Sequence, residues 1–338
     1  MRRPKKHTIS KRQETYHYLQ FNSIVDFHAF CNVEIQQLNA SNKEVWNRIE
    51  GAASEFIQQG KNWFGTPIPK SVDELENHQQ FLGMYLLEKV RPKLKGKLEP
   101  YLYKLADQKL LKPKLDYNNK GLGIFSFDRA AMALSKQYAI NTSAPIDTRI
   151  SQMNVELQKI SFHTSVKEVY TSFSQKQNQL PAIELYLLAG ANAQLGGDQL
   201  LYVGLACGEL VDFLEQRQIP VQVNVLLGTS FNTHKLMNVV CVKRFQDPLD
   251  KNQLLLLASD PRFFRYKGFK SLISISNYFG LNIPNSLGSI ESKMGNEFVK
   301  QINPKAFVFE QSYSIEAAVR EVTTILENYS SNNPNTHA

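Results

Sequence analysis

The clearest hydrophobic pattern lies in the second half of the chain, where short apolar runs alternate with longer segments of helical periodicity. Four runs rich in aliphatic and β-branched residues predict strands at 183–190, 221–228, 238–245 and 306–311. Four segments with apolar residues three and four apart predict helices at 200–218, 252–260, 265–280 and 314–329. This alternation indicates an open α/β sheet of parallel strands covered by helices on both faces.

The first half of the chain shows mainly helical periodicity. Apolar residues recur at helical spacing from Phe21 to Phe30 and again from Val45 to Phe56. We therefore expect a mainly helical N-terminal domain at 15–140 and an open α/β C-terminal domain at 150–330. Residues 1–14 are basic and poor in apolar residues, and residues 331–338 are polar, so we expect two flexible tails.

Polar residues at the predicted helix ends support these boundaries. Ser71 stands three residues before Glu74, which is the spacing of a capping box at a helix start. Asp250 and Ser314 precede two of the predicted C-terminal helices and are suitable N-cap residues. Asp260 stands before a proline, so we expect the helix at 252–260 to end there.

Composition narrows the class of protein. The chain has 338 residues, of which 42% are hydrophobic and 21% charged, as in ordinary globular proteins. No run of about 18 apolar residues predicts a membrane span, and the basic N-terminus has no apolar segment of a secretory signal after it. The three cysteines, Cys31, Cys207 and Cys241, form no CxxC pattern, so we expect neither a disulfide framework nor a cysteine zinc site.

The loop after the predicted strand at 183–190 is the first candidate site. The strand IELYLLAG, a small-residue loop, a helix and the strand VQVNVLL together resemble the first half of a von Willebrand factor A domain. That family carries Asp-x-Ser-x-Ser in this loop, and these oxygens hold a divalent cation. The matching positions here are Ala189, Ala191 and Ala193, so the resemblance implies a degenerate site without a metal. The candidate interaction loop then consists of Gly190, Asn192, Gly196, Gly197 and Asp198.

A second resemblance covers a longer part of the chain. The segments GELVDFLEQRQIPVQVNVLL and VVCVKRFQDPLDKNQLLLLASDPRFFRYKGF resemble an uncharacterised domain family of tailed bacteriophages. The segment WFGTPIPKSVDEL in the first half resembles the same family more loosely. The resemblance implies a phage origin, and hence a location in the bacterial host cytoplasm or the virion, but it implies no activity.

Other residues suited to catalysis have simpler explanations. No two of the seven histidines have a spacing suited to a shared metal, and Cys207 and Cys241 stand among apolar neighbours. The chain also lacks the glycine-rich phosphate loop and the G-x-S-x-G nucleophile motif. We therefore expect no cofactor and no metal, and we assign no catalytic residue.

Two basic segments are candidates for nucleic-acid binding, in line with a formal net charge of +8. In KLKGKL, lysines alternate with Leu94, Gly96 and Leu98, which predicts an extended strip with its cations on one side. The alternative is a solvated sheet edge protected by lysines. In DPRFFRYKGF, cations alternate with aromatic residues, which fits either base stacking or a buried helix face, and the core interpretation is favoured. The candidate nucleic-acid residues are Lys89, Arg91, Lys93, Lys95, Lys97, Arg262, Arg265 and Lys267.

These observations lead to three functional hypotheses. The first is a non-enzymatic, phage-type protein that binds another protein through a metal-free von Willebrand A-like domain. The second is a nucleic-acid-binding accessory protein that uses the lysine-rich strip. The third is a metal-free enzyme whose site is assembled from residues far apart in the sequence. We expect no membrane partner.

Overall fold

A computed structural model describes residues 4–11, 13–65, 67–81, 83–107, 115–118, 124–125, 145, 147–148, 170–173, 182–190, 195, 197–217, 219–285 and 287–331. These residues divide into two compact units. The larger unit combines residues 1–111 with residues 182–338, and the smaller unit spans residues 112–181. In the smaller unit, β5 (Tyr170–Phe173) pairs antiparallel with both β3 (Leu115–Asn118) and β4 (Ile124–Phe125).

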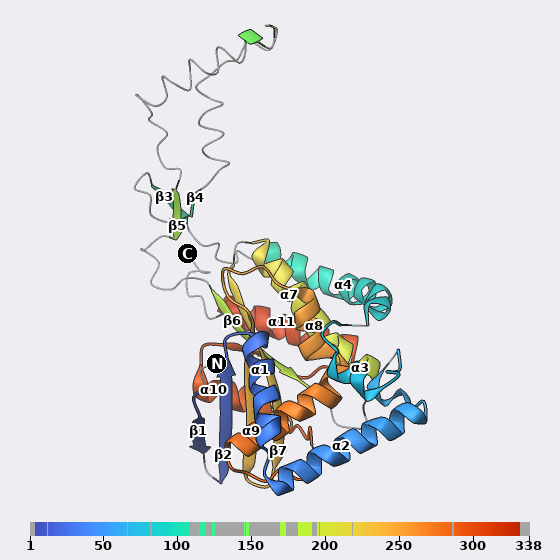
Figure 1. The fold of residues 1–338 in the computed structure, drawn as a ribbon. Coiled ribbons are helices and arrows are strands. Elements are labelled where there is room, and N and C mark those ends of the chain that lie inside the picture. Colours follow the sequence, from blue (N-terminus) through green and yellow to red (C-terminus); the bar gives the residue numbers. More distant parts are fainter. Residues whose placement is uncertain are drawn as a thin grey trace. The chain divides into compact units, whose positions relative to one another are not determined.

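A six-stranded mixed sheet forms the centre of the larger unit, with the strand order β1-β2-β8-β7-β6-β9 (Figure 1). The four predicted C-terminal strands are present as β6 (Ile183–Ala189), β7 (Val221–Phe231), β8 (His234–Lys243) and β9 (Phe307–Phe309). β6 pairs in parallel with β7 on one side and with β9 on the other. The prediction of a mixed helix and strand architecture is confirmed.

The prediction of a purely parallel sheet is wrong, because β7 and β8 form an antiparallel hairpin. Phe231 pairs with His234, so only Asn232 and Thr233 form the loop. Asn232 adopts a left-handed backbone conformation with φ of 50°, which asparagine tolerates better than most residues. The predicted strands at 221–228 and 238–245 left residues 229–237 between them, but Thr229 and Ser230 continue the first strand and are buried.

The N-terminal segment adds two strands to the same sheet. β2 (Glu14–Phe21) pairs in parallel with β8, and β1 (His7–Lys11) pairs antiparallel with β2. Residues 7–11 are therefore ordered rather than part of a flexible tail. The sequence ETYHYLQF alternates aromatic and polar residues and suits a half-buried strand, and this period was missed because Phe21 also fits a helical spacing with Ile24.

The described residues of the predicted N-terminal domain up to Asp107 thus share one sheet and one core with the C-terminal half, whereas β3 and β4 belong to the smaller unit. Its helices are α1 (Ile24–Glu34), α2 (Ala40–Gln58), α3 (Val72–Glu76) and α4 (Met84–Asp107). Its β2 contributes Leu19 and Phe21 to the same hydrophobic cluster as β6 and β7. The predicted boundary at 140–150 falls almost entirely on residues outside the described part of the chain, as does the predicted tail at 331–338 apart from Ser331, which ends α11.

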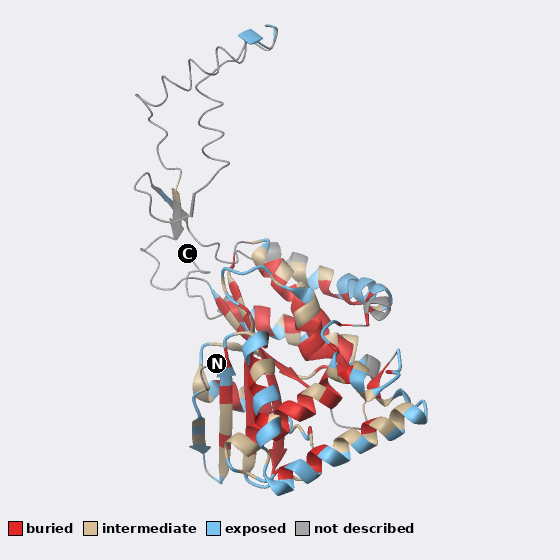
Figure 2. Cartoon of the chain, in the orientation of Figure 1, coloured by how far each residue is buried: buried red, intermediate tan, exposed pale blue. Residues whose placement is uncertain are grey.

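The two faces of the sheet are covered unequally. The larger core lies on one face, under α1, α7 (Leu201–Glu215), α8 (Lys251–Ser259), α9 (Phe269–Tyr278) and α11 (Ile315–Ser331). A smaller cluster on the other face includes Met294, Phe298 and Val299 of α10 (Met294–Ile302). Figure 2 shows that buried residues concentrate along the sheet and the helices that pack on it.

The predicted helix ends are confirmed by backbone hydrogen bonds. Ser71 accepts from the N–H of Glu74, and Asp250 accepts from the N–H groups of Asn252 and Gln253. Ser314 accepts from the N–H of Ala317 at the start of α11. Asp260 ends α8 with an extended backbone, as expected before proline. No helix in the described ranges is long and apolar enough to cross a membrane.

Candidate functional site

The carboxyl end of β6 is filled by protein side chains rather than open to a ligand. Ligands of open α/β sheets commonly bind beyond the carboxyl ends of the strands, and β6 ends at Ala189. Gly190 has φ of 116°, and a Cβ there would collide with the ring of Phe264 and touch Ile290. The carbonyl oxygen of Gly190 accepts hydrogen bonds from Gln311 and from the hydroxyl of Tyr313. These contacts close the end of the strand.

The predicted interaction loop is only partly within the described residues. Gly190 lies at the packed end of β6, while Asn192 and Gly196 lie outside the described residues. Gly197 and Asp198 begin the short 3-10 helix η3 (Gly197–Leu200) before α7. Ala189 is buried in the core, so its methyl group does not face a ligand. Among the described residues, no group of three or more histidine, cysteine, aspartate or glutamate side chains could hold a metal ion.

The basic segment after Asp260 points into the protein. Residues Phe263–Gly268 form a π-helix, η4, which runs directly into α9. The side chains of Arg262 and Arg265 are 2% and 1% exposed, and Lys267 is partly buried. Their assignment to a nucleic-acid surface is therefore wrong as the structure places them. The aromatic residues between them, Phe263, Phe264 and Tyr266, belong to the core, as the alternative interpretation held.

Each cation of this basic segment has a partner in residues 63–78, and Arg265 also donates to the carbonyl oxygen of Leu195 at 2.6 Å. Arg262 binds Glu74 at 2.9 Å, and Lys270 binds Glu76. Arg265 donates to the carbonyl oxygen of Trp63, and Lys267 donates to that of His78 at 2.9 Å. The two segments that share a family resemblance, WFGTPIPKSVDEL and DPRFFRYKGF, therefore pack against each other.

A buried histidine and aspartate also connect the two segments, and we call this set of contacts between residues 63–78 and 260–270 the ionic layer. Nε2 of His78 lies 3.0 Å from Oδ2 of Asp260, and both side chains are almost fully buried. The other carboxylate oxygen of Asp260 accepts from the N–H of Arg262 and so caps the start of the next helix. π-helical turns often occur at functional sites. Here the π-helix places its cations against the carboxylates and carbonyl groups of residues 63–78, so packing between the two segments is enough to explain its presence.

Burial changes the proton affinity of groups in this layer. Burial lowers the pKa of Arg265 to about 10, and it lowers the pKa of Lys267. Burial, followed by the charges of Lys267 and Lys270, lowers the pKa of His28 to about 4. His28 is therefore neutral at pH 7. In Arg262 both Nε and Nη2 are buried without a hydrogen-bond partner, so this layer retains unsatisfied donors.

The lysine-rich strip is a helix, not an extended segment. Lys89, Arg91, Lys93, Lys95 and Lys97 all lie on α4. The buried residues of this helix recur at helical spacing, so the alternation in KLKGKL coincides with one turn of an amphipathic helix. They are Leu87, Leu94 and Leu98, with Val90 and Leu102 partly buried beside them. All five cations are exposed, as the sequence predicted.

Two of these cations are nevertheless engaged by carboxylates of neighbouring helices. Arg91 binds Glu209 of α7 through Nε at 2.6 Å, and Lys97 binds Glu316 of α11. Lys89, Lys93 and Lys95 have no ion pair among the described residues. The free cationic surface of α4 is therefore smaller than the sequence suggested.

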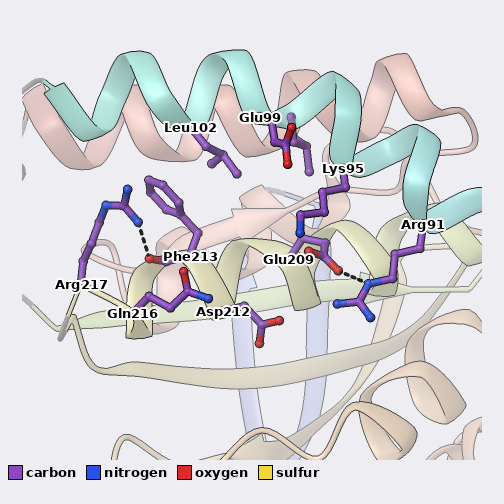
Figure 3. A pocket seen from close by; sticks show the side chains of 10 residues that line it. Arg91, Lys95, Glu99, Leu102, Glu209, Asp212, Phe213, Gln216 and Arg217 are labelled. Atoms are coloured by element: carbon purple, nitrogen blue, oxygen red, sulfur yellow. Dashed lines mark hydrogen bonds and ion pairs between the residues drawn. The ribbon is translucent and has the colours of Figure 1, made fainter.

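A groove with mixed charge lies between α4 and α7 (Figure 3). Its volume is about 300 Å³. Arg217 stacks over the ring of Phe213 at 3.6 Å and donates to the carbonyl oxygen of the same residue. Lys95 points into the groove from α4, toward Glu209. The lining residues comprise three cations, three carboxylates and an apolar floor: Arg91, Lys95, Arg217, Glu99, Glu209, Asp212, Leu98, Leu102 and Phe213, with Gln216 at the end of α7.

A smaller apolar pocket continues this groove on the other side of the Arg91–Glu209 ion pair. Its volume is about 190 Å³, and Arg91 and Glu209 line both spaces. Gly204 and Gly208 stand one turn apart on α7 and form part of its wall, with leucines around them. The N–H of Gly204 donates to Ser259 of α8 at 3.1 Å, so this glycine allows α7 and α8 to approach closely. We call the groove and the pocket together the α4–α7 groove.

Sequence reasoning located the cations of this groove but missed its α7 residues. Glu209, Asp212, Phe213 and Arg217 lie on a helix that the pattern predicts correctly, yet no motif marks them. The spacing of Gly204 and Gly208 was the available signal, because two glycines one turn apart leave a helix surface without side chains.

The fold defines the class as a mixed α/β protein, and comparison with known proteins adds one finding. Residues 168–332, from β5 to α11, match the model of DUF7192, a domain of unknown function. No curated protein and no solved structure matches the chain.

Proposed function

We propose that this chain is a phage-type interaction protein that binds a segment of another protein in the α4–α7 groove. The groove carries this proposal because three cations and three carboxylates surround an apolar floor within about 300 Å³. Protein segments offer both charges together with apolar anchors. Nucleic acid offers a dense row of negative charges, which Glu99, Glu209 and Asp212 would repel.

The fit of a protein segment follows from the two parts of the groove. An apolar side chain fits the pocket of about 190 Å³, whose walls include Leu205, Leu254 and Leu255. Charged side chains of the same segment then meet Lys95 and Arg217, neither of which is paired with a carboxylate among the described residues. Apolar anchors with a charged rim are the usual anatomy of a protein interface.

The von Willebrand A-like assignment is part of the proposal. The order β8-β7-β6-β9, with a helix between β6 and β7 and a hairpin between β7 and β8, supports it. In such a module without its metal, the packed end of β6 leaves recognition to another surface. We place that surface at the α4–α7 groove, and we place the protein in the host cytoplasm or the virion.

Site-specific photocrosslinking tests the proposal. A photoreactive phenylalanine analogue replaces Gln216, which is exposed and lines the groove, in the full chain. The matched control carries the analogue at Val25, which is 71% exposed on α1. After irradiation in a bacterial lysate, we expect discrete adducts from position 216 that protease removes and nuclease leaves intact. Adducts that nuclease removes, or equal adducts from both positions, would contradict the proposal.

A nucleic-acid function is the second candidate, and the exposed side chains of Lys89, Lys93 and Lys95 favour it. Replacing all three with glutamate leaves the buried face of α4 intact. If this function holds, fluorescence anisotropy with nonspecific DNA and RNA detects binding that falls steeply with salt and is lost in the variant. Our proposal predicts no such binding at low salt.

A further inference from the structure

Two histidines from distant parts of the chain meet on adjacent strands. His17 lies on β2 and His234 begins β8, and these strands pair in parallel with Thr15 opposite His234. Nε2 of His17 lies 3.2 Å from Nδ1 of His234. The ring centroids are 5.2 Å apart, and the planes are tilted by 49°. The residues are 217 positions apart, so no sequence spacing could reveal this pair.

The separation of the two nitrogens matches that of two ligands on one metal ion. Imidazole nitrogens bind zinc at about 2.0–2.1 Å, and a tetrahedral angle then places them about 3.3 Å apart. Two strands of one sheet hold these rings, so little rearrangement is needed to bring both lone pairs onto one ion. A single hydrogen bond between the rings accounts for the same distance, and the experiment below separates the two explanations.

The surroundings of His17 resemble the outer shell of a metal ligand. Its other ring nitrogen, Nδ1, lies 3.5 Å from Oγ1 of Thr8 on β1. Such a contact on the far nitrogen orients a ligand ring and leaves Nε2 free to bind.

Aromatic rings enclose the pair on the helix side of the sheet. The ring of Phe279 lies 5.0 Å from that of His17, and the ring of Phe231 lies 5.8 Å from that of His234. The ammonium group of Lys6 lies 5.6 Å from the centre of the Phe279 ring. Among the described residues, no third histidine, cysteine or carboxylate joins the two imidazole nitrogens in a metal-binding group. Two imidazole nitrogens select late first-row ions over Mg²⁺ and Ca²⁺, which prefer oxygen.

We propose that His17 and His234 form a two-histidine site for Zn²⁺, Ni²⁺ or Cu²⁺, and that the bound ion ties β2 to β8. The ring that donates in the hydrogen bond between Nε2 of His17 and Nδ1 of His234 exchanges its proton through solvent to its other nitrogen, so that both rings stay neutral. The two freed lone pairs then coordinate the ion, with water in the remaining positions. This site is independent of the α4–α7 groove. It also shows how the N-terminal strands can be fastened to the C-terminal half of the sheet.

Metal titration of the full, tag-free chain tests the site. Ni²⁺ and Zn²⁺, in turn, are added during thermal unfolding, and Mg²⁺ serves as the control ion. At a metal concentration about 100 times Kd, we expect the melting temperature to rise by several degrees, because the metal binds only the folded site. No rise with Ni²⁺, Zn²⁺ or Cu²⁺ would overturn the proposal.

Variants assign the effect to this pair. His234→Asn removes one ligand from a strand end, and it should weaken the affinity about tenfold or more. His7→Gln is the matched control, since His7 on β1 stacks on Tyr18 instead of joining the pair. The assignment would be contradicted if the metal raised the melting temperature of His234→Asn as much as that of the wild type. It would also be contradicted if His7→Gln abolished this rise. If His234→Asn does not fold, electron paramagnetic resonance of the wild-type chain with Cu²⁺ decides, because the proposal requires two coupled nitrogens per ion.

Discussion

Two basic segments of this chain look alike in sequence and occupy opposite environments. Lys89–Lys97 lies on α4 with its cations exposed, whereas Arg262–Lys270 crosses the π-helix and enters α9 with its cations turned inward. The difference comes from the residues that each segment meets. Residues 63–78 supply carboxylates and carbonyl groups to every cation of the second segment. The exposed segment Lys89–Lys97 of α4, by contrast, has two carboxylate partners among the described residues. A run of positive charge therefore indicates a surface only when no buried partner exists for it.

The largest expected effect is the loss of a buried cation. Arg265→Ala leaves the carbonyl oxygens of Trp63 and Leu195 without their donor and removes the guanidinium from the face of the Trp63 ring. We expect a loss of about 3 kcal/mol or more in the free energy of unfolding, because buried polar groups remain unpaired beside a cavity. Urea denaturation measures it. Lys93→Ala on α4 is the matched control, and an equal loss there would remove the contrast between the two segments.

A pH dependence should follow from His28, which faces the inward cations. Its folded pKa of about 4 lies below the ordinary value of 6.5. Stability is therefore full above pH 6.5 and falls as the pH drops toward 4, because the unfolded chain takes up the proton first. We expect His28 to account for up to about 3 kcal/mol of this fall. Urea midpoints between pH 7 and pH 4, compared with His28→Asn, measure it, and parallel curves for the two proteins would refute this role.

The two glycines of α7 should respond in opposite directions. A Cβ at Gly204 would collide with Oγ of Ser259, so Gly204→Ala should cost about 1–3 kcal/mol by overpacking. The nearest atom to a Cβ at Gly208 is Cδ2 of Leu254 at 4.0 Å, so Gly208→Leu has room in the apolar pocket. It should stabilise α7 by about 0.5–1 kcal/mol through helix propensity. Thermal unfolding of both variants checks the sign, and destabilisation by Gly208→Leu would mean that the pocket is closed.

The smallest expected effect concerns the exposed cations of α4. Single alanine substitutions at Lys89, Lys93 and Lys95 should change the free energy of unfolding by less than about 0.5 kcal/mol, since these side chains are exposed and have no ion pair among the described residues. Urea denaturation at low and high salt measures this. A loss above 1 kcal/mol would show that one of these lysines has a structural partner.

The sequence predicted those features that depend on local patterns. The apolar runs marked β6 to β9, and helix ends such as Asp250 and Ser314 followed from capping chemistry. Pairing between distant strands could not be predicted, because β2 joins β8 across more than half of the chain. KLKGKL was misread because a two-residue alternation of Leu94 and Leu98 also fits a four-residue helical repeat, and only packing against α7 and α11 decides between them.

The candidate site shows the same limit. The cations of α4 were visible in the sequence, but Glu209 and Phe213 became part of a groove only through the packing of α7 beside α4. The inward orientation of Arg262 and Arg265 depended on Glu74 and Trp63, about 190 and 200 residues earlier in the chain. The positions of basic residues are visible in the sequence. Whether their side chains are exposed or buried depends on contacts with residues far away along the chain.

The most direct test of the central claim compares photocrosslinking from position 216 in the wild-type background and in Gly208→Leu. The side chain of this variant extends into the apolar pocket, and a melting temperature at or above the wild-type value, measured on the same sample, separates a loss of binding from a loss of folding. We predict that the protein adducts disappear in Gly208→Leu and persist in the wild-type background. Adducts of equal yield in both would contradict the claim that the α4–α7 groove is the binding surface.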